Sequence, residues 1–316
     1  MSADISVVVA CYNSDYKKLK GTIVSVLLQK NVDLQLIIAD DCSNDNHFDK
    51  IRELLREYDF DNFLLLEAGE NAGTVANVYR AVERAEGEYL KLISPGDFLH
   101  DENVLCKWYE FCRKNDIDVS FGDALYYEND NGNRRLISCY LQPQFSHLYE
   151  IGDYDHKSVI LNYFLLQDSI VGALYFGKTK IFMDYLTRIR GVIRYGEDYA
   201  YRLMLMEGCR LIHYDHPVVF YEYGVGISTK NNSGWMKTLE AECRAVDKMI
   251  YDSPDIGEEF ENKIKYLLSI KDNKAVYRMK KYLTFPELLY WQLRKRVRPR
   301  YSKTNGDISY MEIICR

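Results

Sequence analysis

Four short apolar runs alternate with helical patterns near the start of the chain, and this alternation restricts the fold more than any other feature. The runs are residues 5–10 (ISVVVA), 34–39, 63–66 and 89–93. The first run is β-branched, which is typical of a central strand that is buried on both faces, and the other three are also interpreted as strands. Between the first two runs, apolar residues recur at helical spacing at Leu19, Ile23 and Val26. Connections of one helix each predict right-handed crossovers, and so a doubly wound α/β fold with a mostly parallel sheet.

The second half of the chain is predicted in less detail. We expect further strands at 119–122, 171–176, 210–214 and 218–223, with a helix at 178–186 and another from 196 to about 207. Residues 123–170 are less regular, although the turn 129–132 (NDNG) separates two strand candidates. Beyond residue 233 the pattern is helical, at 234–252, 256–270, 273–283 and 285–297. We therefore expect an α/β domain at 1–230 and a helical, basic C-terminal appendage at 231–316.

Composition and missing motifs exclude several classes of protein. Apolar residues at 47% and charged residues at 28% are ordinary for a soluble protein, and no apolar run approaches the ~20 residues that span a bilayer. The first strand is not followed by GxGxxG, and the chain has no GxxxxGK[ST]. The sequence motifs that usually support dinucleotide-dependent redox chemistry or P-loop chemistry are therefore missing. The eight cysteines form no CxxC pair and no secretory signal pattern is present. We expect free thiols in a reducing cytoplasm.

Polar residues stand at or just beyond several predicted strand ends. They are Tyr12-Asn13, Asp40-Asp41, Asp97, and Glu197-Asp198 at a helix start. The first three groups would share one edge of a parallel sheet, which is where such sheets bind ligands. A carboxylate there suits Mg²⁺ that is shared with a diphosphate. Taken singly, each has a plain alternative, which is a core tyrosine, a turn, a helix cap or a first-turn helix acid.

In this order and spacing, the motifs resemble those of the family 2 glycosyltransferases, which are inverting enzymes of the GT-A fold. The matching segments are ISVVVACYN, IIADDCSND, ENAGTVANVYRAVERAEGEYLKLISPGDFL, GEDYAYRL and YGVGIST. The resemblance covers about residues 4–230. It implies transfer of a sugar from a nucleotide sugar, most often UDP-linked, to a hydroxyl of a glycan or lipid-linked glycan in surface polysaccharide synthesis.

The resemblance also implies roles for single residues. Tyr12 would stack on the uracil, Ala10 would line that pocket by its backbone, and Asp41 would accept from the base N3–H with Asp40 alongside. Asp97 would hold Mn²⁺ or Mg²⁺ on the diphosphate, and Asp198 matches the catalytic base. The remaining donor-site positions are Gly96, in the turn before Asp97, and Lys230, which could reach the phosphates or be a solvated loop lysine.

Two departures from the family pattern leave other functions open. Ser94 and Gly96 stand where acids are common, and Val78 and Tyr79 stand where Arg-Asn is common. An alternative is therefore a non-catalytic, nucleotide-sugar-binding partner of a glycosyltransferase complex. A sugar-1-phosphate nucleotidyltransferase is disfavoured because its Gly-rich, Arg-containing loop does not follow the first strand. Without an HExxH motif, His213 and His216 are interpreted as structural.

The C-terminal region is strongly basic. Residues 274–303 hold ten Lys or Arg against one acid, whereas the whole chain carries a net charge of −6. Within it, residues 285–300 (FPELLYWQLRKRVRPR) place apolar residues before arginines, which suits a helix at an anionic membrane surface. A helix packed on the domain with solvated arginines is the alternative. Nothing resembles a nucleic-acid recognition module. We expect a cytoplasmic protein, free or peripherally bound at the inner face of the membrane.

Overall fold

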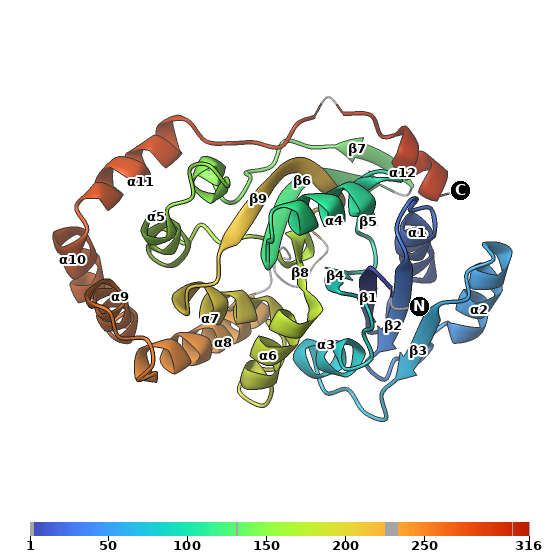
Figure 1. The fold of residues 1–316 in the computed structure, drawn as a ribbon, viewed down its shortest axis with the longest axis horizontal. Coiled ribbons are helices and arrows are strands. Elements are labelled where there is room, and N and C mark those ends of the chain that lie inside the picture. The colour runs from blue at the N-terminus through green and yellow to red at the C-terminus, as the bar shows by residue number, and fades with distance from the viewer. Residues whose placement is uncertain (1–2, 131, 225–232, 305, 316) are drawn as a thin grey trace.

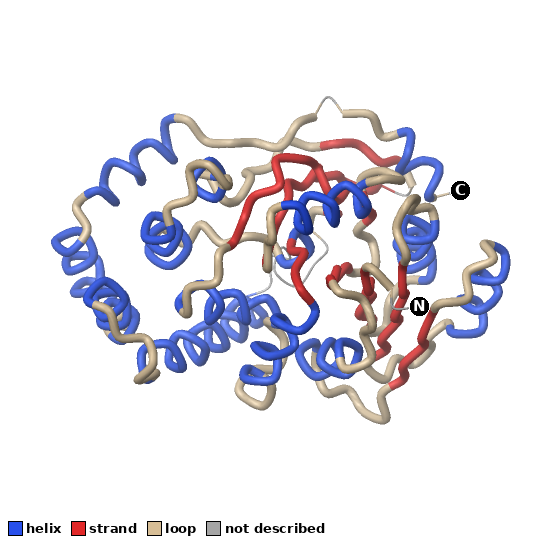
Figure 2. Tube along the Cα trace, in the orientation of Figure 1, coloured by secondary structure: helices blue, strands red, loops and turns tan. Residues whose placement is uncertain are grey.

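A single curved sheet forms the centre of the molecule. The computed structural model describes residues 3–130, 132–224, 233–304 and 306–315. The strand order is β3-β2-β1-β4-β8-β6-β9-β5, with β7 paired to β6 (Figure 1). This arrangement confirms the predicted α/β class, and Figure 2 shows helices lying along the strands over the N-terminal part.

The N-terminal half is a parallel sheet with crossover helices, as the alternating pattern predicts. Its strands are β1 (Ile5–Cys11), β2 (Leu34–Asp40), β3 (Phe63–Glu67) and β4 (Tyr89–Ile93). Its helices are α1 (Tyr16–Leu27), α2 (Phe48–Glu57) and α3 (Thr74–Val82). β1 lies between β2 and β4, with Cys11 opposite Asp40 and Val9 opposite Ile93. The carboxyl ends of these three strands therefore meet at one edge.

The second half departs from the predicted alternation. β8 (Tyr175–Lys178) runs antiparallel to both β4 and β6 (Val119–Asp130), and β7 (Asn133–Leu136) closes a hairpin on β6. The prediction of a strand at 171–176 was wrong in its first half, because η3 (Gly172–Leu174) is a 3-10 turn. The remaining elements here are β5 (Phe98–Leu99), α4 (Val104–Lys114), α6 (Thr179–Ile189), η4 (Glu197–Tyr199) and α7 (Ala200–Met206).

One long strand, β9 (Leu211–Glu222), replaces the two strands expected at 210–214 and 218–223. A proline such as Pro217 cannot donate to a ladder, so a break was expected there. Instead, the register between β6 and β9 shifts between Phe121 and Ala124, and Pro217 pairs with Asp123 inside this irregularity. A bulge thus accommodates the proline without ending the strand.

Helical turns occupy part of the region that had no clear pattern. They are η1 (Ser146–Tyr149), α5 (His156–Ile160) and its π-helical continuation η2 (Leu161–Leu165). All of η2 is buried. These turns are short and lack an amphipathic pattern, so periodicity does not reveal them.

The C-terminal region is helical, as predicted. It consists of α8 (Ser233–Asp252), α9 (Glu259–Ser269), α10 (Lys274–Thr284), α11 (Glu287–Val297) and α12 (Ser309–Ile314). After α11 the chain crosses the molecule and α12 lies near α1 (Figure 1). On the way, the backbone N–H of Ser302 donates to the carbonyl of Cys139 at 2.8 Å. The helices and the sheet share one continuous core, which includes Val246, Leu288 and Met311.

Two further expectations concern membranes and thiols. Among the described helices, we find none that is both long and apolar enough to cross a bilayer. All eight cysteines are free thiols, as expected.

Candidate active site

The loops after β1 and β2 are joined into one rim at the sheet edge. Asp40 is buried and its carboxylate accepts from the Ser43 N–H at 2.8 Å and the Ser43 hydroxyl at 2.5 Å. Asn13 donates from its backbone to the Ser43 Oγ at 2.7 Å, and its Oδ1 accepts from the Asn44 N–H at 3.0 Å. Tyr12 follows β1 with 53% of its surface exposed, so its ring is open to stacking. Ala10 pairs with Ala39 at the base of the rim.

Asp41 fixes the turn that begins α3. Its two carboxylate oxygens accept from the backbone N–H groups of Ala72 at 3.0 Å and Gly73 at 2.8 Å. Gly73 has a φ of +92°, and a side chain there would lie 2.3 Å from the Cγ of Arg194, so only glycine fits. Each carboxylate oxygen can accept a second hydrogen bond. The turn contact therefore leaves Asp41 able to bind a further donor.

A continuous set of hydrogen bonds leads from Asp41 to the segment that carries Asp198. The Arg194 guanidinium donates to the Asn71 carbonyl at 2.7 Å, and the Arg194 carbonyl accepts from the Val75 N–H at 3.0 Å. The Glu242 carboxylate then accepts from the backbone N–H groups of residues 194, 195 and 196, at 2.9 to 3.1 Å. The predicted base-binding and reaction ends are thus parts of one connected structure.

Asp198 lies in the 3-10 turn that leads into α7. Its side chain is half-buried and packs against Gly172, where an added Cβ would lie 3.4 Å from Oδ2. Burial raises the pKa of Asp198, and the charge of Glu242 raises it further, while Arg202 acts in the opposite direction. Burial and the neighbouring Asp198 also raise the pKa of Glu197. A carboxylate whose pKa is raised toward neutrality is suited to accept a proton at physiological pH.

Helix α8 holds the chain between Arg194 and Arg202 at three points that sequence reasoning missed. Besides Glu242, the Leu239 carbonyl accepts from the Tyr199 hydroxyl at 3.1 Å. Asp247 forms a buried ion pair with Arg202, with an Nε–Oδ1 distance of 3.0 Å, and a second ion pair with Lys271 at 3.0 Å. The sequence did contain a signal for Glu242. It lies four and eight positions before Val246 and Ile250, which places it on the same face of α8 as these buried apolar residues. A charge on the buried stripe of a helix indicates a specific partner.

Asp97 is buried at the end of the turn after β4. Its Oδ1 accepts from the Glu222 N–H at 3.2 Å, and burial raises its pKa to about 7. Lys91 is fully buried, and burial lowers its pKa to about 7 although the charge of Asp97 opposes this shift. The Lys91 ammonium donates to the Ala173 carbonyl, which adjoins the Gly172 that contacts Asp198. Lys91 thus links the surroundings of Asp97 and Asp198.

Gly96 approaches a second carboxylate. It has a φ of +104°, and an added Cβ would lie 2.7 Å from the Glu222 Oε2. Its N–H donates to the Thr22 hydroxyl at 3.0 Å, and Glu222 forms an ion pair with Lys18 at 2.6 Å. Glu222 therefore supplies a carboxylate beside the position where this sequence has glycine instead of an acid. Sequence reasoning missed it because β9 lies far along the chain. Lys230 and most of its loop lie outside the described residues.

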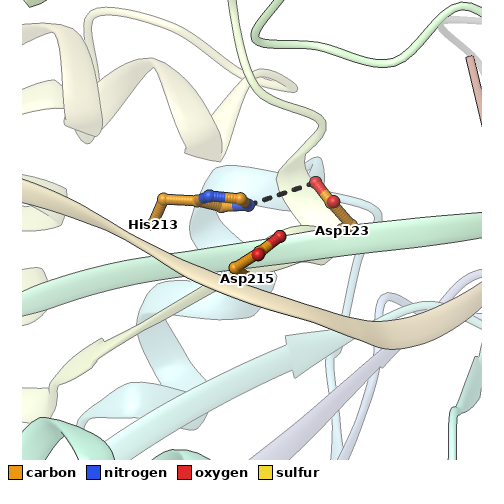
Figure 3. A group of neighbouring side chains, drawn as sticks. All are labelled: Asp123, His213 and Asp215. Atoms are coloured by element: carbon orange, nitrogen blue, oxygen red, sulfur yellow. Dashed lines mark hydrogen bonds and ion pairs between the residues drawn. The ribbon is translucent and has the colours of Figure 1, made fainter. Parts of the chain in front are cut away.

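A separate acidic group lies between β6 and β9. Asp123, His213 and Asp215 offer ligand atoms within 4.8 Å of one another (Figure 3). The His213 Nε2 lies 3.2 Å from the Asp123 carboxylate, whose other oxygen accepts from the Arg300 guanidinium at 2.9 Å. This geometry could hold a metal ion, but Arg300 already balances the charge of Asp123. The contacts favour the structural interpretation of His213.

A cavity of about 1230 Å³ opens beside Asp198. Its walls come from η2, from the start of α7, and from α8, α10 and α11, which lie around this end of the molecule in Figure 1. Asp198, Tyr199 and Arg202 line one side of it. The carboxylate predicted to accept a proton thus faces a space large enough for an organic substrate.

Comparison with known proteins gives a consistent family and fold. A family model described as "Glycosyl transferase family 2" matches residues 6–171. Poly(ribitol-phosphate) beta-glucosyltransferase of Bacillus spizizenii is 29% identical over 121 residues, which are 37% of this chain and 18% of that protein. TuaG of Bacillus subtilis, whose name connects it with teichuronic acid biosynthesis, is 31% identical over 120 residues, which are 37% of this chain and 45% of that protein. The chain therefore matches less than half the length of these curated relatives.

Solved structures share the fold. S. aureus TarS 1-349 in complex with UDP superposes with a TM-score of 0.56 at 17% identity, over 83% of this chain and 69% of that chain. Mannosyltransferase PcManGT from Pyrobaculum calidifontis, in complex with GDP-Man and Mn²⁺, gives a TM-score of 0.56 at 12% identity, over 99% of this chain and 79% of that chain. The fold is the GT-A type that the motifs indicate.

Proposed function

The chain belongs to glycosyl transferase family 2, and from this premise we propose that it transfers a sugar from a nucleotide-sugar donor to a hydroxyl of a glycan or lipid-linked glycan. The observation that carries the proposal is the hydrogen-bonded connection from Asp41 through Arg194 and Glu242 to the Asp198 segment. The names of the two curated relatives support a role in cell-surface polysaccharide synthesis.

The donor would bind along the sheet edge. Tyr12 would stack on the base, the backbone of Ala10 would line the same pocket, and Asp41 would accept from the base with Asp40 alongside. The TarS structure contains UDP and the PcManGT structure contains GDP-Man. Both support a nucleotide sugar as the donor, and we favour a UDP-sugar because of the resemblance of the Tyr12 and Asp41 motifs.

Mn²⁺ or Mg²⁺ would fit beside Asp97. Two carboxylates, Asp97 and Glu222, lie close enough for the charge of Glu222 to raise the pKa of Asp97. Hard cations prefer such oxygen ligands, and Lys18 already balances part of this negative charge. When bound, the cation supplies positive charge for the diphosphate that leaves. Gly96 leaves this place free for the Glu222 side chain, and Lys230 would approach the phosphates from its loop.

Asp198 would act as the general base. It would take the proton of the acceptor hydroxyl as that oxygen attacks the anomeric carbon on the face opposite the diphosphate, which inverts the configuration. Glu197 is adjacent in sequence but lies about 120° away around the 3-10 turn, so we assign it to orienting the acceptor. The cavity beside Asp198 provides the space from which an acceptor would approach.

Replacement of the base tests the function. We expect Asp198→Asn to lower transfer by roughly 10²–10⁴-fold, because the amide cannot take the proton. UDP should still raise the melting temperature as in wild type, since a ligand that binds the folded state stabilises it. The measurement is UDP release from a panel of UDP-sugars with Mn²⁺, and Asp184→Asn, an exposed acid on α6, is the matched control. Near wild-type turnover of Asp198→Asn would refute the assignment.

A non-catalytic, nucleotide-sugar-binding partner is the second candidate. The observation that favours it is the absence of acidic side chains at Ser94 and Gly96. The same panel separates the two candidates. Stabilisation by UDP without release of UDP from any sugar donor or acceptor mixture would favour the binding protein, whereas release that depends on Asp198 supports the enzyme.

The outer face of α11 supports peripheral contact with a membrane. Leu289, Tyr290, Leu293 and Val297 are 55 to 66% exposed. Trp291, in contrast, packs toward Phe145 with ring centroids 6.1 Å apart, so this residue faces the protein. An exposed apolar face beside arginines suits an anionic bilayer. Flotation with phosphatidylglycerol vesicles tests it, and absence of binding to both anionic and neutral vesicles would remove the proposal.

A further inference from the structure

The cavity beside Asp198 is distinct from the predicted donor-binding edge. Its lining includes Asp198 but not Tyr12, Asp41 or Asp97. The opposite walls come from α8, α10 and α11. A molecule in this space would therefore contact the C-terminal helices at one side and the proposed general base at the other.

The lining of the cavity is strongly basic. Nine Lys or Arg side chains line it, against the three carboxyl side chains Asp198, Glu240 and Asp272. Several of these cations are matched within the protein, because Arg202 and Lys271 pair with Asp247, Arg244 with Glu240, and Lys295 with Asp168. Within the described part of the chain, the five others have no carboxylate within ion-pair distance. They are Lys237, Lys274, Arg278, Lys281 and Arg296.

One buried lysine has hydrogen-bonding capacity left over. Lys281 is 9% exposed, and its ammonium donates to the Leu165 carbonyl at 3.1 Å and lies 4.6 Å from the centre of the Tyr282 ring. An ammonium has three protons, so one carbonyl does not satisfy it. The hydroxyl of Tyr277, which also lines the cavity, is buried without a hydrogen-bond partner among the described residues. Both groups can donate a hydrogen bond to an acceptor atom that the described residues do not supply.

We propose that this cavity receives the acceptor of the reaction and selects one that carries phosphate groups near the reactive hydroxyl. The inference rests on the function proposed above. Phosphate oxygens accept hydrogen bonds from several cations at once, and the free cations come from three different helices. Tyr199 and Tyr277 offer flat apolar surfaces for the sugar or polyol part. The volume of about 1230 Å³ exceeds that of a single sugar phosphate, which fits a short stretch of a phosphate-containing chain.

Binding of defined oligomers tests the proposal without use of the metal or of transfer activity. The probes are a soluble glycerol-phosphate oligomer, an oligogalacturonate of equal charge and a neutral oligosaccharide of equal length, measured by titration calorimetry with UDP present. We expect the phosphate oligomer to bind at least tenfold more tightly than the other two. The charge-removal variant, Lys274→Gln with Arg278→Gln and Arg296→Gln, should weaken that binding by about tenfold or more.

A matched variant removes the same number of charges outside the cavity, at Lys107→Gln, Lys114→Gln and Lys280→Gln. It should bind the phosphate oligomer as wild type does, and UDP should stabilise all three proteins equally. If the triple cavity variant unfolds, the single variants Lys274→Gln and Arg278→Gln, at exposed positions, provide the same comparison.

Four results would overturn the inference. In the first two, the neutral oligomer or the uronate binds wild type as tightly as the phosphate oligomer does. In the third, the cavity variant binds the phosphate oligomer as tightly as wild type does. In the fourth, wild type binds only phosphatidylglycerol vesicles, and the cavity variant loses that binding. The last would assign the cations to a membrane surface. A wild-type protein that UDP does not stabilise would instead refute the proposed function, so the two failures are distinguishable.

Discussion

At the scale of single residues, the surroundings of Asp198 decide what its carboxylate can do. Burial, together with the charge of Glu242, disfavours the ionised form, whereas Arg202 favours it. Glu242 also has a structural role, because its carboxylate accepts hydrogen bonds from three backbone N–H groups just before the 3-10 turn. The same side chain thus positions Asp198 and adjusts its proton affinity.

Glu242→Gln should separate these two effects. The amide has no charge, so the pKa of Asp198 falls, and the base form persists to lower pH. We expect the acidic limb of the pH profile of kcat/KM to move to lower pH, together with a lower Tm from weakened hydrogen bonds. The control is Asp252→Asn, an exposed acid on the same helix, which should leave the limb in place. An unmoved limb, or one moved to higher pH, would contradict the assignment.

The backbone conformation of Gly96 predicts that alanine is not tolerated at this position. Alanine at a φ of +104° is strained by about 1–3 kcal/mol, and its Cβ would lie 2.7 Å from the Glu222 Oε2. We expect Gly96→Ala to lower Tm and to weaken the stabilisation by UDP, because Glu222 must move. The control is Gly152→Ala, where no atom lies within 4 Å. Equal Tm values for the two variants in a thermal unfolding scan would show that Gly96 is not constrained as described.

The residues that sequence could predict share one property, which is that they end a strand or begin a helix. Asp40, Asp41, Asp97 and Asp198 are visible because an apolar run or a helical pattern adjoins each of them. Glu222 ends β9 and Glu242 lies inside α8, but no local pattern indicates the partner of either one. Glu222 contacts Lys18 from 204 positions away, and Glu242 contacts Gly196 from 46 positions away. Contacts between elements so far apart depend on the tertiary fold, which local patterns do not encode.

At the scale of elements, α8 connects the C-terminal region to the candidate site. Its buried Val246 and Ile250 pack in the common core, and its polar residues bind the 194–199 segment and α7. The Arg202–Asp247 pair is buried on both sides, with side-chain exposures of 7% and 3%. A buried ion pair contributes to stability mainly through the penalty that follows when one partner is removed.

Asp247→Asn should therefore destabilise the protein strongly. The substitution leaves the charge of Arg202 buried without its carboxylate, at a cost of roughly 3–5 kcal/mol. We expect a clear fall in Tm and in the free energy of unfolding measured with urea. Asp252→Asn removes one partner of an exposed pair with Lys248 and should change stability by about 1 kcal/mol or less. If the two variants unfold alike, the buried pair does not hold α7 to α8.

The order of elements could be predicted where each strand is followed by its own helix, as in β1 to β4. The pairing of the strands after residue 123 could not be predicted, because it does not follow sequence order. β8 lies between β4 and β6, and the bulge opposite Pro217 keeps β9 whole. The π-helical turn η2 is apolar throughout, and a short apolar run of that length reads equally as strand or helix.

At the scale of the whole molecule, the C-terminal region encloses the α/β part instead of extending from it. Lys295 of α11 pairs with Asp168 at 3.0 Å, and Arg300 reaches Asp123 at 2.9 Å. Met311 of α12 is fully buried, and α12 lies near α1 at the other end of the molecule (Figure 1). The boundary at residue 230 therefore separates two sequence patterns, and whether it also separates two folding units stays a prediction to test.

Truncation distinguishes the two possibilities. We expect a chain of residues 1–230 to be much less stable than the full chain and to bind UDP poorly, because it lacks Glu242, Asp247 and the apolar side chains of α8 and α12. A chain of residues 1–255 keeps α8 and should recover part of the stabilisation by UDP, while it lacks the far walls of the cavity and should not bind the glycerol-phosphate oligomer. Thermal unfolding with and without UDP, and calorimetric titration with the oligomer, provide both measurements. Full stability and UDP binding by residues 1–230 would show that the α/β part is independent, and that α8 does not hold the Asp198 segment in place.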